Sequence, residues 1–228
     1  MVEKFELINI LLGEVGGGGR YLEIGVQTGI TYAYVEAKVK VGVDPMPMLG
    51  YNMVFLLNIW GRRNEREWYL VPDTSDVFFK DGFKVAEIPK EYEVIFVDGL
   101  HEYRQVLRDI RNSMEHLVDG GYILIHDTAP DSAKKASGKA EEGDWNGTVY
   151  QAIYDLHISG AKYYTVEGMP EGMTILPKQE LRLPTASETP GISYEEFDKN
   201  RAEILHLKPF ADILREIKGN KAEGTQSG

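Results

Sequence analysis

The fold is decided by residues 92–127, which read YEVIFVDGLHEYRQVLRDIRNSMEHLVDGGYILIHD. Residues 93–97 are apolar almost without alternation, which is typical of a parallel strand that helices cover on both faces. Residues 103–117 carry apolar side chains at helical spacing, and residues 119–121 (Asp-Gly-Gly) end that helix before a second apolar run at residues 122–125. This order predicts a strand, a helix and a second, parallel strand.

Both predicted strands end in ionisable side chains. Asp98 and His101 follow the first strand, and His126 and Asp127 follow the second. In an open α/β sheet, ligands bind outside the carboxyl ends of the strands. We therefore expect these four side chains to converge on one crevice, which is the candidate active site.

A second informative stretch, YLEIGVQTG at residues 21–29, predicts a strand that runs into a glycine turn. Gly25 and Gly29 would allow a tight turn and a close approach of a ligand to the backbone. We expect Glu23 to face the crevice as an acceptor, and the hydroxyl of Thr31 to cap the next helix. The dinucleotide fingerprint G-x-G-x-x-G is absent, which disfavours a nicotinamide enzyme.

Asp44 ends the next predicted strand, at residues 40–43, and follows Glu23 by 21 residues. That spacing is typical of an acid that binds a ribose diol. Alternatively, Asp44 caps the helix that follows it. Together with Glu23 and the two glycines, Asp44 predicts an adenosine-type ligand.

The composition favours small-molecule chemistry in one main domain. The chain has 228 residues, is 43% hydrophobic, and carries a formal charge of -11, which excludes a general nucleic-acid or anionic-membrane surface. It contains no cysteine, so disulfides and zinc-thiolate sites are excluded. The first residues lack a basic segment, and no apolar run approaches membrane-spanning length, so we expect a cytoplasmic protein.

Residues 23–29, EIGVQTG, match the acid-x-Gly-x-x-x-Gly motif of class I S-adenosylmethionine-dependent methyltransferases, and the chain resembles that family. Residues 98–103 (DGLHEY), with the later Gly-Gly and His-Asp pairs, resemble its branch of metal-dependent sugar and macrolide O-methyltransferases. The resemblance covers residues 20–176. It implies a Rossmann-like, seven-stranded, mostly parallel sheet with helices on both faces and a C-terminal antiparallel hairpin, which residues 162–166 and 173–176 would form.

The resemblance also implies site residues. Contacts to S-adenosylmethionine would come from Glu23, Gly25, Val26, Gly29, Thr31, Asp44, Ser75 and Asp98. Relatives usually carry Gly-Asp-Ser where this chain has Asp-Thr-Ser at residues 73–75, so only the serine is in register. Asp98, His126 and Asp127 would hold Mg²⁺ or Mn²⁺, with His126 standing where the family has an acid. An imidazole ligand shifts the preference toward a transition metal.

The resemblance implies an S-adenosylmethionine-dependent O-methyltransferase that acts on a small hydroxylated acceptor with the help of a divalent cation. Asp98 and His101 would be its catalytic residues. Two alternatives stay open: a metal-independent methyltransferase in which His101 is the base, or a binding protein that recognises an adenosyl ligand without turnover. In a purely structural alternative, His101 caps its helix and His126 bonds a neighbouring carbonyl.

Three segments are expected along the chain. Residues 1–19 would form an N-terminal helix and glycine linker, residues 20–176 the methyltransferase domain, and residues 177–228 a helical tail with a disordered end. The tail helix would begin with a capping box at Ser193 and be interrupted by Pro209, and its apolar stripe would pack on the domain or on a second subunit.

Two segments inside the domain are less regular. Residues 49–60 are apolar enough for a helix. Residues 128–147 are a polar insertion directly after Asp127. This insertion is either a mobile surface loop or a lid whose Trp145 covers the acceptor.

Overall fold

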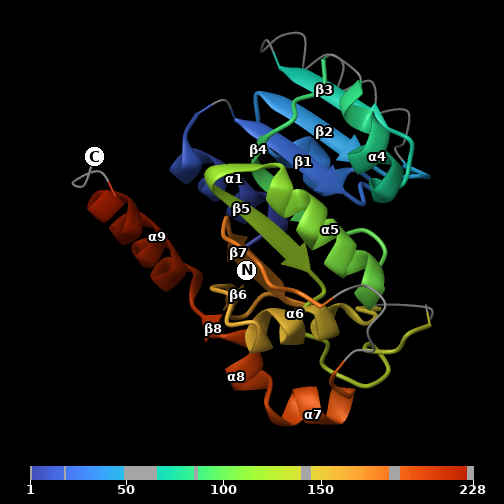
Figure 1. Cartoon of the computed structure of the whole chain (residues 1–228), viewed down its shortest axis with the longest axis vertical. Helices are drawn as coiled ribbons and strands as arrows, with labels where there is room; N and C mark the ends of the chain where they lie inside the picture. The colour runs from blue at the N-terminus through green and yellow to red at the C-terminus, as the bar shows by residue number, and fades with distance from the viewer. Residues whose placement is uncertain are drawn as a thin grey trace.

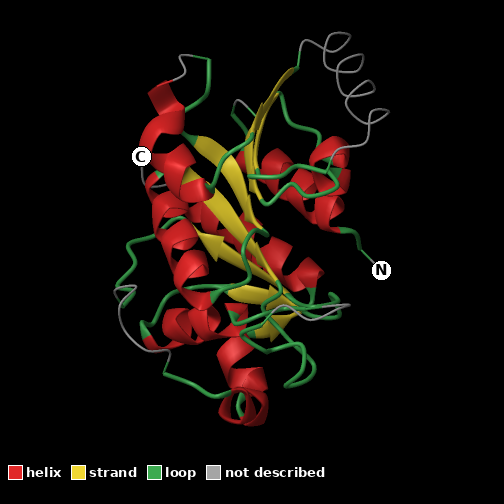
Figure 2. Cartoon of the chain, turned by 90° about the vertical axis from the view of Figure 1, so that its right-hand side faces the viewer, coloured by secondary structure: helices red, strands yellow, loops and turns green. Residues whose placement is uncertain are grey.

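A computed structural model describes residues 2–17, 19–48, 66–84, 87–139, 145–184 and 191–224. Within them, one eight-stranded sheet has the order β3-β2-β1-β4-β5-β7-β6-β8 (Figure 1). Helices lie on both sides of this sheet, which forms the middle layer (Figure 2). The helix expected at residues 49–60 lies outside the described residues. None of the described helices combines the length and the apolar character that a membrane crossing requires.

The first five strands run parallel, as predicted from the unbroken apolar runs. They are β1 (Arg20–Ile24), β2 (Val39–Val43), β3 (Glu67–Val71), β4 (Tyr92–Val97) and β5 (Leu117–His126). Every residue of β4 is buried, which confirms that both faces of this strand are covered. Ile24 pairs with Val43 and with Val97, so the strand ends are level at one edge of the sheet.

The C-terminal strands include the predicted antiparallel hairpin. β7 (Met173–Pro177) pairs antiparallel with both β5 and β6 (Tyr164–Val166). An eighth strand, β8 (Leu207–Lys208), pairs parallel with β6 and was not predicted. Two residues are too few to show the alternation by which a strand is recognised in a sequence. The sheet therefore has eight strands where the family resemblance implied seven.

Helices pack against the sheet through two hydrophobic clusters, one on each face. The helices are α1 (Lys4–Val15), α2 (Ile30–Tyr34), α4 (Ser75–Asp81), α5 (Tyr103–Glu115), α6 (Val149–Ile158), α7 (Tyr194–Lys199), α8 (Arg201–Leu205) and α9 (Phe210–Gly224). Ile95 joins the cluster that contains residues of α5 and α6, whereas its neighbours Val94 and Phe96 join the cluster that contains residues of α1 and α9. This alternation follows from the two-residue period of a strand.

The start of α2 differs from the prediction. Gly29, in the left-handed region with φ 77°, occupies the N-cap position, and Thr31 is already the second helical residue. The turn after β1 needs a positive φ immediately before the helix, and glycine meets that need without a side-chain penalty. In α4, by contrast, the hydroxyl of Thr74 caps the helix by accepting from the Val77 amide.

The C-terminal tail packs on the domain of its own chain. Ser193 and Glu196 form the predicted capping box, and the chain passes Pro209 before α9 begins. Most of the apolar stripe of the tail is buried, at Phe197, Ile204, Leu205, Ile213 and Ile217, whereas Leu207 is exposed. The helix continues to Gly224, past Gly219 where we expected order to end. These side chains are covered by the same chain. An oligomer that forms through the tail stays a prediction.

Candidate active site

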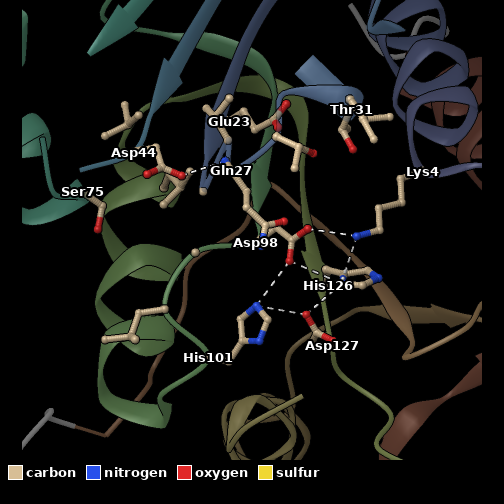
Figure 3. A pocket seen from close by; sticks show the side chains of 18 of the residues that line it. Lys4, Glu23, Gln27, Thr31, Asp44, Ser75, Asp98, His101, His126 and Asp127 are labelled. Carbon is tan, nitrogen blue, oxygen red and sulfur yellow. Dashed lines mark hydrogen bonds and ion pairs between the residues drawn. The ribbon is translucent and has the colours of Figure 1, made fainter. Parts of the chain in front are cut away.

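A pocket of about 880 Å³ opens at the carboxyl ends of β1, β2 and β4, as the strand order predicts. Of the residues predicted to contact the donor, seven line it: Glu23, Gly25, Val26, Thr31, Asp44, Ser75 and Asp98. Gly29 does not line the pocket and instead begins α2. His101, His126 and Asp127 line the opposite part (Figure 3). We call Gly25, Asp44 and Ser75, with the turn after β1, the donor half.

The turn after β1 is fixed by contacts within the protein. Gly25 has φ +87°, and a Cβ at this position would collide with the carbonyl oxygen of Asp98. The Gly25 amide donates to Val43 at 2.9 Å, and the Asp98 amide donates to Ile24 at 2.9 Å. Glycine is therefore needed to bring the ends of β1 and β4 together, and Gly25 also lines the pocket.

Asp44 braces this turn from the end of β2. Its carboxylate accepts from the Gln27 amide at 2.7 Å and from the Met46 amide at 2.8 Å. The Met46 bond is a local turn contact, and the helix that Asp44 would cap in the alternative role lies outside the described residues. A carboxylate has about four lone-pair sites, so these two bonds leave acceptor capacity for a ligand hydroxyl in the pocket.

Glu23 is buried and accepts a 2.7 Å hydrogen bond from the Tyr21 hydroxyl. Burial raises the pKa of Glu23 to about 8, and the charge of Asp98 adds to the increase. At neutral pH the side chain is therefore largely a neutral acid, and it lines the pocket as we expected of an acceptor. A neutral carboxyl group can also donate a hydrogen bond to a ligand.

Acidic and basic side chains from separate segments meet in the other part of the pocket. We call Lys4, Asp98, His101, His126 and Asp127 the charged cluster. His101 Nε2 lies 3.1 Å from Asp127 Oδ2 and 3.5 Å from Asp98 Oδ1. His126 Nδ1 lies 2.8 Å from Asp127 Oδ2 and 3.3 Å from Asp98 Oδ1. The four residues predicted from the two strand ends thus come together (Figure 3).

His101 is oriented by the end of the polar insertion. Its Nδ1 lies 2.9 Å from the Trp145 carbonyl oxygen, so this nitrogen carries a proton in either charge state and Nε2 faces the carboxylates. The two rings are 5.4 Å apart, and the Thr148 amide donates to the His101 carbonyl at 2.9 Å. Gly147 has φ +62°, and a Cβ there would collide with the His101 backbone. Trp145 also lines the pocket, and its role as a lid stays a prediction.

Asn146 was not indicated by the sequence, because it lies in a polar insertion without periodicity. Its side chain is fully buried and donates to Asp127 Oδ1 at 2.9 Å. Asp127 itself has φ 60°, a left-handed conformation that aspartate tolerates better than most residues. Asn146 therefore fixes a carboxylate that the backbone already holds in an unusual conformation.

Lys4 was also missed, because nothing in the apolar pattern of α1 marks its first turn as part of a site. Its Nζ lies 3.0 Å from Asp98 Oδ2 and 3.3 Å from His126 Nδ1. These contacts join residues 94 and 122 positions apart in the chain. Only tertiary packing could reveal them.

The electrostatics favour ion pairs within the charged cluster. Burial disfavours an imidazolium, but hydrogen bonds to Asp127 and Asp98 outweigh it and raise the pKa of His126 to about 9. The pKa of His101 is raised as well: burial lowers it, and the hydrogen bond to Asp98 and the charge of Asp127 overcome that effect. Burial raises the pKa of Asp98, but hydrogen bonds from His101 and His126 bring it well below its ordinary value.

The ligand atoms of Asp98, His101 and Asp127 lie within 4.8 Å of one another, as a metal site requires. This group contains His101 in place of the predicted His126. However, all four carboxylate oxygens already contact nitrogens of the chain: Lys4 and Asn146 reach one oxygen each, and the two imidazoles reach the others. With Lys4 in place, these residues do not fit a resident divalent cation.

Comparison with known proteins agrees with this architecture. Residues 22–128 match a family model described as a methyltransferase domain. The structure is similar to an O-methyltransferase from Bacillus cereus solved in complex with SAH, with 11% identity, a TM-score of 0.52, and 78% of this chain and 83% of that chain covered. A cofactor-bound protein from MTB gives 14% identity, a TM-score of 0.51, and coverage of 79% and 82%. No curated protein sequence matches significantly. At these identities the structural likeness shows the fold.

Proposed function

We propose that the chain is a class I S-adenosylmethionine-dependent methyltransferase and that it transfers the donor methyl group to a hydroxyl oxygen of a small acceptor, as the methyltransferase match of residues 22–128 supports. One observation carries this proposal. A single pocket joins the glycine turn and Asp44 to His101, which is positioned to take up a proton. Methyl transfer needs both parts, because the donor carbon must lie in line with an oxygen that loses its proton.

The donor half supplies the contacts for S-adenosylmethionine. Gly25 lines the pocket without a side chain, which allows the donor to approach the backbone, and the carboxylate of Asp44 has acceptor capacity for the ribose hydroxyls. Ser75 and Thr74 line the pocket beside Asp44, on the side where we place the adenine. These roles follow from position in the pocket and from the family resemblance.

We assign the general base to His101. The Trp145 carbonyl holds the proton on Nδ1, so Nε2 is the nitrogen that accepts the proton of the acceptor hydroxyl. As the oxygen attacks the methyl carbon, the carbon–sulfur bond breaks and the sulfonium becomes a neutral thioether. Asp98 and Asp127 then stabilise the imidazolium that forms.

The pocket wall indicates an acceptor with an apolar part. Leu100 and Ile30 line the pocket and are each 56% exposed, and Phe5 and Trp145 also line it. Donor and acceptor must share about 880 Å³, which favours a small molecule over a macromolecular chain. We therefore propose a compact hydroxylated acceptor with an apolar or aromatic face.

A divalent cation is the second candidate arrangement, favoured by the convergence of ligand atoms from Asp98, His101 and Asp127. Bound there, Mg²⁺ or Mn²⁺ would orient the acceptor oxygen and lower its pKa. His101 would then be a ligand and could not be the base. This arrangement requires Lys4 to leave Asp98.

Two measurements test the proposed function. Calorimetry should show binding of S-adenosylhomocysteine (SAH), and labelled S-adenosylmethionine should methylate a member of a panel of phenols, catechols and sugars. We expect transfer to persist in EDTA, and a complete loss in EDTA that Mn²⁺ restores would support the cation arrangement instead. A chain that binds SAH but methylates no panel member would support adenosyl binding without turnover, and absence of SAH binding would contradict the proposal.

A further inference from the structure

The charged cluster contains a cation that the chain itself supplies. Lys4 lies in the first turn of α1, and its ammonium donates to Asp98 Oδ2 at 3.0 Å (Figure 3). Its side chain is one-third exposed, whereas that of Asp98 is only 17% exposed. The ion pair therefore forms where the ammonium meets a partly buried carboxylate, so solvent screens it less than an ion pair on the surface.

The helix that carries Lys4 is held firmly. Leu7, Ile8 and Leu11 of α1 are fully buried, and α1 contacts both β4 and β5. A capping box between Glu3 and Glu6 fixes the helix start, one residue before Lys4. The lysine is thus delivered to the ends of β4 and β5 by core packing, which distinguishes it from a long side chain that forms a surface ion pair by chance.

The position of the ammonium has a chemical consequence. Asp98 Oδ1 contacts the two imidazoles, and Lys4 takes Oδ2, so both oxygens of this carboxylate are engaged. A metal ion held by Asp98, His101 and Asp127 would have to share the Asp98 carboxylate with the Lys4 ammonium. Two positive charges on one carboxylate would repel strongly in a partly buried site.

We propose that Lys4 is a positioning residue and the resident cation of this site, which excludes a divalent metal ion. It holds Asp98 in the orientation that presents Oδ1 to His101. Its meaning for methyl transfer rests on the proposed function, whereas its exclusion of a metal ion follows from the charged cluster alone. The proposal predicts that removal of the ammonium opens the cluster to a divalent cation.

The experiment measures Mn²⁺ binding by electron paramagnetic resonance and calorimetry. Wild type, Lys4→Arg and the exposed control Lys80→Met should bind Mn²⁺ no more tightly than about 1 mM. Lys4→Met and Lys4→Gln should bind it roughly tenfold or more tightly, because Asp98 loses its cationic partner. Adding Asp98→Asn to Lys4→Met should abolish the gain, which a purely structural role of Lys4 would not produce.

Two outcomes would overturn the proposal: tight stoichiometric Mn²⁺ binding by wild type, or no gain in Lys4 variants that keep the wild-type melting temperature. Tight Mn²⁺ binding by wild type would overturn the proposal even if both Lys4 variants fail to fold. SAH binding is measured on the same samples. Its absence in wild type would contradict the proposed function and leave the Mn²⁺ result standing, so the two failures are distinguishable.

Discussion

The donor half of the pocket takes its residues from successive strand ends, whereas the charged cluster takes its residues from α1, the β4 end and the β5 end. In the donor half, backbone amides do much of the work, as at Gly25 and in the two bonds that Asp44 accepts. In the charged cluster, side chains face one another, and Lys4 meets partners 94 and 122 positions away in the sequence. The donor half therefore depends mainly on backbone geometry, whereas the charged cluster depends on charged side chains.

The largest expected effect tests the charged cluster alone. Replacing the base in His101→Gln should slow methyl transfer by about 10²–10⁴-fold and leave SAH affinity unchanged. The control His116→Gln alters an imidazole that does not line the pocket, bonds the Lys90 carbonyl and packs against Phe79 and Phe83. Steady-state rates and calorimetry measure the two effects, and a comparable loss of SAH affinity would show that the two halves are not separable.

The pH profile sharpens the same prediction. The base must be neutral, so the wild-type rate should fall as the pH drops through the pKa of His101, which lies above its ordinary value. This acidic limb should be absent from the residual activity of His101→Gln. An unchanged limb would assign the titration to another group.

In the donor half, Gly25→Ala should be the most harmful change. The positive φ and the collision with the Asp98 carbonyl together should lower the free energy of unfolding by roughly 3 kcal/mol or more. Gly13→Ala is a matched control, because its Cβ meets nothing within 4 Å and alanine favours a helix. Urea unfolding compares them. Equal stability of the two variants would mean that the turn tolerates a side chain.

Glu23, which lies beside the donor half, should make the stability of the protein depend on pH. Its pKa is about 8 when folded, against an ordinary value of 4.5, so folding retains a proton. The stabilisation by this proton is therefore fully present below about pH 4.5. As the pH rises to about 8, the free energy of unfolding falls by on the order of a few kcal/mol. Glu23→Gln should remove this decline. If the free energy of unfolding changed with pH in the same way in wild type and in Glu23→Gln, Glu23 would not be a buried neutral acid.

The smallest expected effect is on donor affinity. Asp44→Asn should weaken SAH binding by about 1.5–3 kcal/mol, because it removes a charged acceptor. Methyl transfer at saturating donor should change little. Glu67→Gln, at the start of β3 and exposed, is the control. Calorimetry gives both affinities, and a variant that binds SAH like wild type would remove Asp44 from the donor site.

Short-range patterns in the sequence predicted much of the donor half and the sheet. The apolar runs at residues 93–97 and 122–125 identified β4 and β5, and their ends identified Asp98 and Asp127. Thr31 was wrong as an N-cap, because the turn needed a positive φ at Gly29. β8 was missed because two residues show no period.

The sequence by itself determined the parallel strands, the glycine turn and the edge of the sheet at which four ionisable residues meet. Each of these follows from a local property: the two-residue period of a strand, the conformational freedom of glycine, and the direction in which a strand runs. Tertiary structure decided the charge balance of the site. Burial made Glu23 a neutral acid, and core packing of α1 brought Lys4 to Asp98. Neither could be predicted locally, because desolvation and ion pairing depend on which distant segments surround a group.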